Sequence, residues 1–455
     1  MKRKVIIASA AVAVCLITAV ILFFSLKDNS STPITVLDSS GEAIGVITKL
    51  YPSAVKCKKP EYSPYINRAA AETAEIISKR EQVPLEKVNS KADSITAVKT
   101  AFNAQVFEAC KAAYEESEIK EARFGAAFTD LNGALLCCFS SDFELDYTNQ
   151  KNQPFSSIKP LSVYAPAIER GVINWSTAIE DTPVKKIKGD SGETVDWPTN
   201  GTGRYEYRPV TVCEAVKLSL NTVAVKSLLQ LGAENSIEFL SDKLSMDMES
   251  EKRLLIAYGE EEILADLGLG YLKTGVTVAD MAGYYQIFAN GGMYVKPYTV
   301  MSIEKSDNEL YYEVQAEKSR AVSEETAFIM NNLLQNTLTK GGTAQKAAVE
   351  GLKTGGKTGT GSNASGSWFA GFTPEYSFAI WHSKPKNQKN NCSEIFSLIA
   401  KNLPCDSSKD YPACSTVVRK AYCADSGGLI TQSCREMKVG YYKAEAVPKE
   451  CSEHR

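Results

Sequence analysis

Apolar and polar residues alternate along this chain in two rhythms, one typical of strands and one typical of helices. Residues 34–50 form two β-like runs around a Ser-Gly turn, and residues 124–141 form a hairpin pattern around Asp-Leu-Asn-Gly. Strand-like runs return within residues 356–383, before a helical pattern at 393–403. Helical spacing also covers residues 66–82, 94–118, 160–170, 211–231, 277–290 and 323–338. Hairpins near both ends with helices between them predict an α+β domain, in which helices cover one sheet.

The N-terminus carries a long apolar run. Residues 5–26 form a run of 22 uncharged residues, which follows Lys2, Arg3 and Lys4. Such a run spans a hydrocarbon core of about 30 Å and exceeds the core of an ordinary signal peptide. Positive residues on its N-terminal side predict a cytoplasmic N-terminus and a body outside the membrane. We therefore expect an uncleaved single-pass anchor in the cell membrane, and a cleaved signal peptide is the alternative.

Composition narrows the chemistry further. The chain has 51 basic and 54 acidic residues, so no overall basic field indicates a nucleic-acid partner. Its only histidines are His382 and His454, which disfavours histidine-dependent nucleophiles and histidine-rich metal centres. Six of the twelve cysteines lie between Cys392 and Cys451, and none forms a C-x-x-C pair. We expect extracytoplasmic disulfides there rather than a zinc site.

Three short motifs suggest a serine nucleophile that works without histidine. Ser156 and Lys159 lie one helical turn apart, and a lysine whose pKa is lowered can serve as the base. Ser219-Leu220-Asn221 follows in the chain. Lys-Thr-Gly occurs three times, beginning at Lys273, Lys353 and Lys357. Each motif alone is weak, but S-x-x-K, S-x-N and K-T-G in this order are the set of penicillin-recognising serine acyltransferases.

Longer stretches around these motifs resemble the transpeptidase domain of high-molecular-weight penicillin-binding proteins of the bifunctional, class A type. The similar stretches include residues 208–232, 276–300, 322–344 and 355–374, and the Cys-containing tail resembles these enzymes as well. The resemblance covers roughly residues 121–455. It implies an α/β/α fold of the penicillin-binding protein and serine β-lactamase type, in which helices flank a five-stranded, mainly antiparallel sheet.

On this basis the chain divides into four parts. We expect a cytoplasmic tip and membrane anchor at 1–27, a linker or pedestal at 28–120, the transpeptidase domain at 121–404 and a Cys-rich tail at 405–455. Bifunctional relatives also carry a glycosyltransferase domain whose catalytic stretch contains a histidine. Residues 28–120 contain no histidine and are too few for that domain. We therefore expect no glycan polymerisation by this chain, and a separate glycosyltransferase as a partner.

The resemblance assigns catalytic roles residue by residue. Ser156 is implied to be the acylated nucleophile, and Lys159 the base that activates it. Ser219 is implied to relay a proton to the leaving amine, and Asn221 to hold the substrate peptide. The implied reaction is acyl transfer from a D-Ala-D-Ala stem peptide to an amine of a neighbouring stem, or to water. β-Lactams acylate the same serine, and the reaction needs no metal and no cofactor.

The third motif is implied to bind the substrate. Lys357 anchors its terminal carboxylate and, by repulsion, favours the neutral form of Lys159. Thr358 and Thr360 lie on one face of a strand, so both hydroxyls are available to that carboxylate. Gly359 leaves room for the substrate backbone, and the backbone N–H groups of the nucleophile and Thr360 form the oxyanion hole.

Position decides among the three Lys-Thr-Gly copies. Only Lys357 is followed by a further Thr and then by the next strand of a hairpin. Lys353 precedes Gly355-Gly356, which is a turn signal, and Lys273 lies between two helical patterns. We expect only the copy at Lys357 to act in catalysis.

The chain departs from the family pattern at three positions: Asn152 replaces an Arg, Phe155 replaces the Gly before the nucleophile, and Gly366 replaces an Asp. Phe155 either narrows the cleft or packs beneath the helix. Two other functions use the same motifs. One is a D,D-carboxypeptidase, and the other is a non-catalytic β-lactam-binding sensor or scaffold in cell-wall synthesis.

Overall fold

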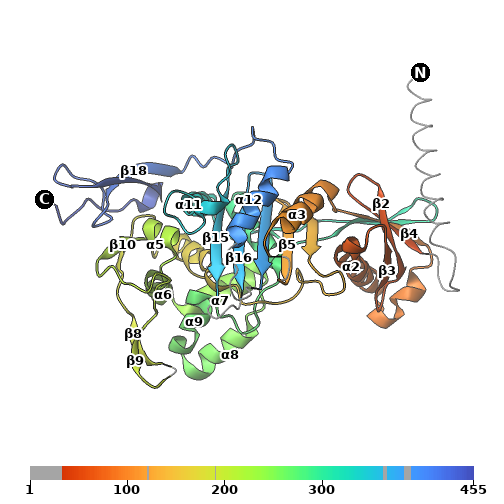
Figure 1. Cartoon of the computed structure of the whole chain (residues 1–455), viewed down its shortest axis with the longest axis horizontal. Helices are drawn as coiled ribbons and strands as arrows, with labels where there is room; N and C mark the ends of the chain where they lie inside the picture. The colour runs from red at the N-terminus through yellow and green to blue at the C-terminus, as the bar shows by residue number, and fades with distance from the viewer. Residues whose placement is uncertain (1–32, 120–121, 190, 362–365, 384–390, 455) are drawn as a thin grey trace.

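A computed structural model describes residues 33–119, 122–189, 191–361, 366–383 and 391–454 of the chain. Its centre is a five-stranded sheet in the order β15-β16-β17-β5-β6, with every neighbouring pair antiparallel (Figure 1). The strands are β5 (Phe124–Asp130), β6 (Leu135–Ser140), β15 (Gly355–Thr360), β16 (Ser367–Phe372) and β17 (Tyr376–His382). The hairpin expected at 124–141 is thus joined edge to edge with the strands expected near the C-terminus, and the α+β prediction is confirmed.

Helices cover both faces of this sheet. The helix α12 (Cys392–Asn402) stacks the ring of Phe396 on Phe378 of β17, with centroids 4.2 Å apart. On the other face the Ser377 hydroxyl donates to the Ala282 carbonyl of α10 (Val278–Tyr285), 2.5 Å away. Ser377 and Phe378 are neighbours in one strand, so their side chains leave opposite faces. The sheet is therefore buried on both sides, as its wholly buried strands β16 and β17 require.

A second, six-stranded sheet lies at the N-terminal end of the molecule (Figure 1). Its order is β13-β12-β4-β1-β2-β3, and it is mixed because β1 and β4 are parallel. The strands are β1 (Ile34–Leu37), β2 (Ala43–Lys49), β3 (Ala54–Cys57), β4 (Ile95–Thr100), β12 (Val300–Lys305) and β13 (Leu310–Glu313). β12 thus joins this sheet some 200 residues after β4, and no local sequence pattern predicts that pairing.

One predicted helix is wrong at its start. Helical spacing indicated residues 94–118, but the structure has β4 there first, and the helix α3 spans only Ala104–Glu116. The segment Ile-Thr-Ala-Val-Lys-Thr of β4 is rich in β-branched residues, and it pairs with β1 on one side and β12 on the other. Hydrogen bonding to the edges of β1 and β12 therefore outweighs the helical pattern of this segment. Asn103 then caps α3 by accepting from two backbone N–H groups.

The remaining helices lie between the sheets and around the central one. They are α2 (Ser63–Glu81), α4 (Ala165–Glu169), α5 (Val212–Leu218), α6 (Asn221–Leu231), α7 (Ala233–Glu238), α8 (Glu249–Tyr258), α9 (Leu264–Leu269) and α11 (Glu324–Asn336). Four two-stranded pairs complete the fold: β7 (Ala178–Glu180) with β10 (Pro209–Thr211), β8 (Lys185–Lys188) with β9 (Thr194–Trp197), β11 (Met293–Val295) with β14 (Lys318–Arg320), and β18 (Val417–Cys423) with β19 (Met437–Lys443). Within the described ranges no helix is both long and apolar enough to cross a bilayer. The anchor expected at 5–26 lies outside those ranges.

The C-terminal hairpin β18–β19 lies at the end of the molecule opposite the six-stranded sheet (Figure 1). Tyr441 of β19 holds it to the rest of the molecule, with edge-on ring contacts to Trp175 and to Phe328 of α11. The disulfides expected in the tail are absent from the described part of the chain, where every cysteine is a free thiol.

Candidate active site

The turn that carries Ser156, the expected nucleophile, is a short 3-10 helix, Phe155–Ser157, hereafter the nucleophile turn. It continues through a π-helical stretch into α4. Ser157 is fully buried, and its hydroxyl donates to the carbonyl oxygen of Pro154 at 2.6 Å. Ser156 is only partly buried. Of the two adjacent serines, Ser156 is therefore the one whose hydroxyl is accessible to a ligand, and it lies one turn before Lys159.

Phe155 adopts φ of 50°, in the left-handed region where a glycine is usual. Its ring is 3% exposed and packs edge-on against Tyr271, with centroids 5.7 Å apart. Of the two expectations for Phe155, packing inside the protein is therefore the one that the structure shows. The buried ring contact offsets the backbone strain of about 1–3 kcal/mol.

Two glycines allow the nucleophile turn to sit where it does. A Cβ on Gly270, whose φ is +82°, would lie 2.0 Å from the carbonyl oxygen of Phe155. A Cβ on Gly359 would lie 2.4 Å from the carbonyl oxygen of Pro154 and 3.0 Å from the backbone nitrogen of Ser157. Gly359 was expected to leave room for a substrate. In the structure its open side faces the nucleophile turn, so this glycine joins β15 to that turn.

Lys159 is completely buried, and its ammonium nitrogen is surrounded by oxygens of the S-x-N segment. Nζ donates to Asn221 Oδ1 at 2.6 Å and to the carbonyl oxygen of Ser219 at 3.2 Å. Burial, and secondly the positive charge of Lys357, hold the pKa of Lys159 well below its usual value. A lowered pKa favours the neutral form of a lysine, and a neutral lysine can accept a proton from a serine hydroxyl.

Lys357 is the second fully buried lysine, and it reaches the same segment from the opposite side. Its Nζ donates to Ser219 Oγ at 2.7 Å and to the carbonyl oxygen of Thr358 at 3.1 Å. Burial lowers the pKa of Lys357 to about 7. Within the described part of the chain, the hydrogen-bond acceptors of both lysines are neutral oxygens. A carboxylate that entered here would be the first negative charge to meet them.

The S-x-N segment is a break between two helices. One helix was expected over 211–231, but α5 ends at Leu218, Ser219 takes the left-handed φ of 59°, and α6 begins at Asn221. The break turns the Ser219 hydroxyl toward one lysine and its carbonyl toward the other. The sequence pattern missed it because the apolar spacing of α5 continues almost in phase into α6.

Two residues that sequence reasoning missed fix this segment. Asn200 Oδ1 accepts from the backbone nitrogens of Asn221 at 2.8 Å and Thr222 at 3.3 Å. These first N–H groups of α6 have no acceptor within the helix, so Asn200 supplies it. Asp181 is fully buried and accepts from the Asn200 side-chain nitrogen at 2.8 Å and from the Thr222 hydroxyl. Both come from the polar stretch 178–208, whose composition gave no signal of such a position.

The three Lys-Thr-Gly copies differ in the burial and in the partners of their lysines. Lys273 pairs with Asp266 at 3.1 Å and Lys353 with Asp410 at 2.5 Å, and both lysine side chains are about half exposed. Only Lys357 is buried beside the other motifs. The prediction of a turn at Gly355-Gly356 is wrong, because both glycines belong to β15. A Cβ on either glycine would lie within 2.7 Å of a phenylalanine ring, so close packing explains them.

Farther along β15, Thr358 is partly buried and Thr360 is exposed. Alternation along the strand places both on the same face. The four motif residues that the structure connects by hydrogen bonds are Lys159, Ser219, Asn221 and Lys357. The nucleophile turn and β15 complete the site through backbone contact at Gly359.

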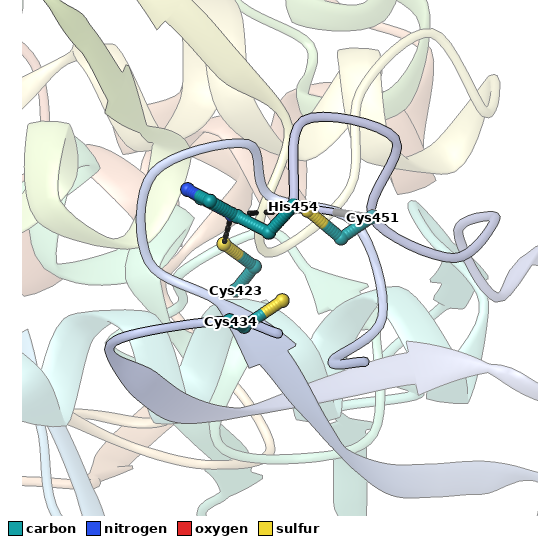
Figure 2. A group of neighbouring side chains, drawn as sticks. All are labelled: Cys423, Cys434, Cys451 and His454. Atoms are coloured by element: carbon teal, nitrogen blue, oxygen red, sulfur yellow. Dashed lines mark hydrogen bonds between the residues drawn. The ribbon is translucent and has the colours of Figure 1, made fainter. Parts of the chain in front are cut away.

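A second cluster of reactive side chains lies in the tail. Cys423, Cys434, Cys451 and His454 each bring one ligand atom into a group whose members are all within 4.8 Å of one another (Figure 2). The absence of a C-x-x-C pair argued against a zinc site here. That argument does not cover this cluster, because three separate segments of the chain supply its members.

A helix-covered antiparallel sheet, with S-x-x-K, S-x-N and K-T-G segments meeting beside one edge strand, is the arrangement typical of the class of penicillin-recognising serine acyltransferases. The family description "Penicillin binding protein transpeptidase domain" matches residues 100–402, more than half of the chain. The chain therefore belongs to the penicillin-binding protein transpeptidase family.

The individual relatives of this chain are named as penicillin-binding proteins as well. The chain is 30% identical over 271 residues to penicillin-binding protein 1A of Clostridium acetobutylicum, covering 58% of this chain and 32% of that protein. It is 31% identical over 277 residues to penicillin-binding protein 1A/1B of Bacillus subtilis, covering 56% of this chain and 28% of that protein. The chain thus spans about a third or less of the length of these curated relatives.

Solved structures show the same fold. The D,D-transpeptidase domain of a peptidoglycan glycosyltransferase from Eggerthella lenta superimposes with a TM-score of 0.63 at 19% identity, covering 82% of this chain and 98% of that one. Penicillin-binding protein A from M. tuberculosis, as an imipenem acyl-enzyme complex, gives a TM-score of 0.62 at 15% identity, with coverages of 82% and 99%.

Proposed function

We propose that this chain is a D,D-transpeptidase that cross-links peptidoglycan stem peptides through an acyl-enzyme on Ser156. The observation that carries the proposal is the pair of buried lysines on either side of Ser219. Lys159 faces the Ser219 carbonyl and Lys357 faces its hydroxyl, and burial lowers the pKa of both. A surface lysine near a serine would have neither property.

These contacts, and the position of Ser156 one helical turn before Lys159, support the following reaction. Neutral Lys159 takes the proton of the Ser156 hydroxyl as Oγ attacks the carbonyl carbon of the penultimate D-Ala. The C–N bond then breaks, and the leaving D-Ala nitrogen receives a proton through Ser219. Protonated Lys357 faces the terminal carboxylate, together with the hydroxyls of the two threonines of β15. The amine of a second stem peptide attacks the ester carbonyl carbon and loses a proton to Lys159. The C–O bond to Ser156 then breaks, and Lys159 returns the proton to Oγ.

We extend the proposal to β-lactams, because one of the similar structures is named as an imipenem acyl-enzyme complex. A β-lactam presents a strained amide and a carboxylate to the same groups. Ring opening leaves no departing amine, so the acyl-enzyme persists and can be detected.

The test is covalent labelling of the full chain with a fluorescent penicillin, read by gel and by intact mass. Ser156→Ala should abolish the adduct. Ser157→Ala is the matched control and should retain it, because the Ser157 hydroxyl is bound to the Pro154 carbonyl. A D-Ala-D-Ala peptide with an amine acceptor should then yield free D-Ala and a cross-linked product.

The outcomes separate the alternative functions. Labelling without any D-Ala release would identify a β-lactam-binding sensor or scaffold. D-Ala release with water as the only acceptor would identify a D,D-carboxypeptidase. Labelling that persists in Ser156→Ala would show that the nucleophile assignment is wrong.

We also propose that the protein acts on the outer face of the cell membrane, anchored by residues 5–26, which carry no charge. The full chain should sediment with membranes after a carbonate wash, and a chain beginning at residue 27 should not. Recovery of the full chain in the soluble fraction would contradict the anchor.

A further inference from the structure

The tail cluster is built from three separate pieces of chain. Cys423 is the last residue of β18, Cys434 lies in the loop before β19, and Cys451 and His454 lie in the C-terminal segment. His454 Nδ1 lies 3.4 Å from Cys423 Sγ and 3.4 Å from Cys451 Sγ. Figure 2 shows these side chains gathered between the loops of the tail.

The spacing of these atoms discriminates between a disulfide and a metal site. A disulfide would bring one pair of sulfurs to about 2.05 Å. A tetrahedral zinc ion, with bonds of about 2.3 Å to sulfur and about 2.0 Å to nitrogen, separates its ligands by roughly 3.5–3.8 Å. The two separations of 3.4 Å between His454 Nδ1 and a sulfur are close to the edge of such a tetrahedron, and all four ligand atoms lie within 4.8 Å of one another. All three cysteines are free thiols.

Groups outside the cluster stabilise it in the way that zinc ligands require. The Ser426 hydroxyl donates to Cys451 Sγ at 3.2 Å, and the backbone nitrogen of Thr431 donates to Cys434 Sγ at 3.3 Å. Such donors favour the thiolate form that binds metal. While Nδ1 of the histidine faces the sulfurs, its Nε2 faces Asp425 Oδ2 at 3.6 Å. A carboxylate behind a ligating histidine orients the ring and selects its tautomer.

We propose that Cys423, Cys434, Cys451 and His454 bind one Zn²⁺ as a closed structural site. Three thiolates and one imidazole fill all four positions of a tetrahedron, which leaves none for a substrate or a reactive water. Binding converts three thiols to thiolates and releases three protons, with no change of oxidation state.

The position of the cluster indicates what the metal would hold together. The loop between Cys423 and Cys434 carries Gly427, which packs so closely on the segment after α4 that a Cβ would lie 1.9 Å from the Ser176 carbonyl oxygen. The Ser176 hydroxyl donates to the Gly427 carbonyl at 2.5 Å and accepts from Tyr442 at 2.9 Å. Ser176 follows α4, the helix that continues from the nucleophile turn. Zinc would thus fix residues 451–454 and the loop that carries Gly427 as one unit.

The test measures metal directly and does not depend on transpeptidase activity. The full chain is purified with a phosphine reductant and without chelators, and zinc is measured by plasma mass spectrometry. We expect one zinc per chain, lost in Cys434→Ser and in Cys451→Ser. Cys414→Ser is the matched control, because Cys414 lies in the same tail but outside the cluster, and it should retain the metal.

A second measurement covers the case in which a cluster variant does not fold. Replacing zinc by Co²⁺ in the unmodified chain should produce the intense visible bands of tetrahedral cobalt with thiolate charge transfer, and added Zn²⁺ should remove them. A metal-free chain without these bands would overturn the proposal, as would a disulfide between two of the three cysteines in the protein isolated without reductant. Zinc retained equally in Cys434→Ser and in Cys414→Ser would overturn it too.

Discussion

Replacing Lys357 by methionine should stabilise the protein while it abolishes penicillin labelling. Burial lowers the pKa of Lys357 to about 7, whereas an unfolded lysine titrates near 10.4. At pH 7 the unfolded chain therefore binds about half a proton more at this side chain than the folded chain does, and the excess approaches one proton between about pH 8 and pH 9.5. By linkage this difference costs the folded state about 4 kcal/mol. Methionine has a similar length and carries no charge to desolvate.

Two hydrogen bonds offset part of that gain. Lys357 donates to Ser219 Oγ and to the Thr358 carbonyl oxygen, and each bond contributes about 1 kcal/mol. The net gain expected for Lys357→Met at pH 7 is about 2 kcal/mol in the free energy of unfolding. The sign changes with pH: because the folded pKa is lowered, the cost of the lysine is largest below pH 7 and disappears as pH rises toward 10.4. At pH 10 the variant should therefore be slightly less stable than the parent.

The assay is urea unfolding of both proteins at pH 7 and pH 10, alongside fluorescent-penicillin labelling. Lys353→Met is the control, because Lys353 is about half exposed and forms only a surface pair with Asp410. It should change stability by less than about 1 kcal/mol at both pH values and keep its labelling. If Lys357→Met is destabilised at pH 7, or if its stability relative to the parent does not vary with pH, Lys357 is not a buried amine of lowered pKa.

Three further results are expected. The rate of penicillin acylation should fall above about pH 7, where Lys357 loses its charge, and it should also fall at low pH, where the base Lys159 becomes protonated. A rate that rises up to pH 9 would contradict this. Asp181→Asn should slow acylation about 5- to 150-fold, the equivalent of about 1–3 kcal/mol, by loosening the start of α6 at Asn221; unchanged kinetics in a folded variant would show that the network is not needed. Gly270→Ala should prevent acylation by displacing the nucleophile turn, whereas Gly259→Ala, at a similar φ but in open space, should lose only stability, as melting temperature and labelling will show.

The local chemistry of the site was predictable from the sequence. Ser156 and Lys159 are three residues apart, and a helical turn places them on one face whatever the rest of the chain does. The choice of Lys357 also followed from its local context, because a strand hairpin comes directly after it. The buried ring of Phe155, by contrast, could not be chosen over a narrowed cleft, since its partner Tyr271 is more than a hundred residues away.

The errors have a common physical origin. The strand at 95–100 and the break at Ser219 are both places where long-range pairing outweighs a weak local preference. β4 is a strand because β1 and β12 lie on either side of it, and β12 begins some 200 residues later. Ser219 leaves the helix where Asn200, from another segment, satisfies the first N–H groups of α6.

Spacing along the chain is enough to give the order of the motifs, the residue types that they supply and the alternation of strands and helices. The tertiary structure decided which groups are buried. It lowered the pKa of two lysines by removing water from around them, and it brought three cysteines and a histidine together from separate segments. Burial and long-range contact arise only when distant segments pack, so no local pattern contains them.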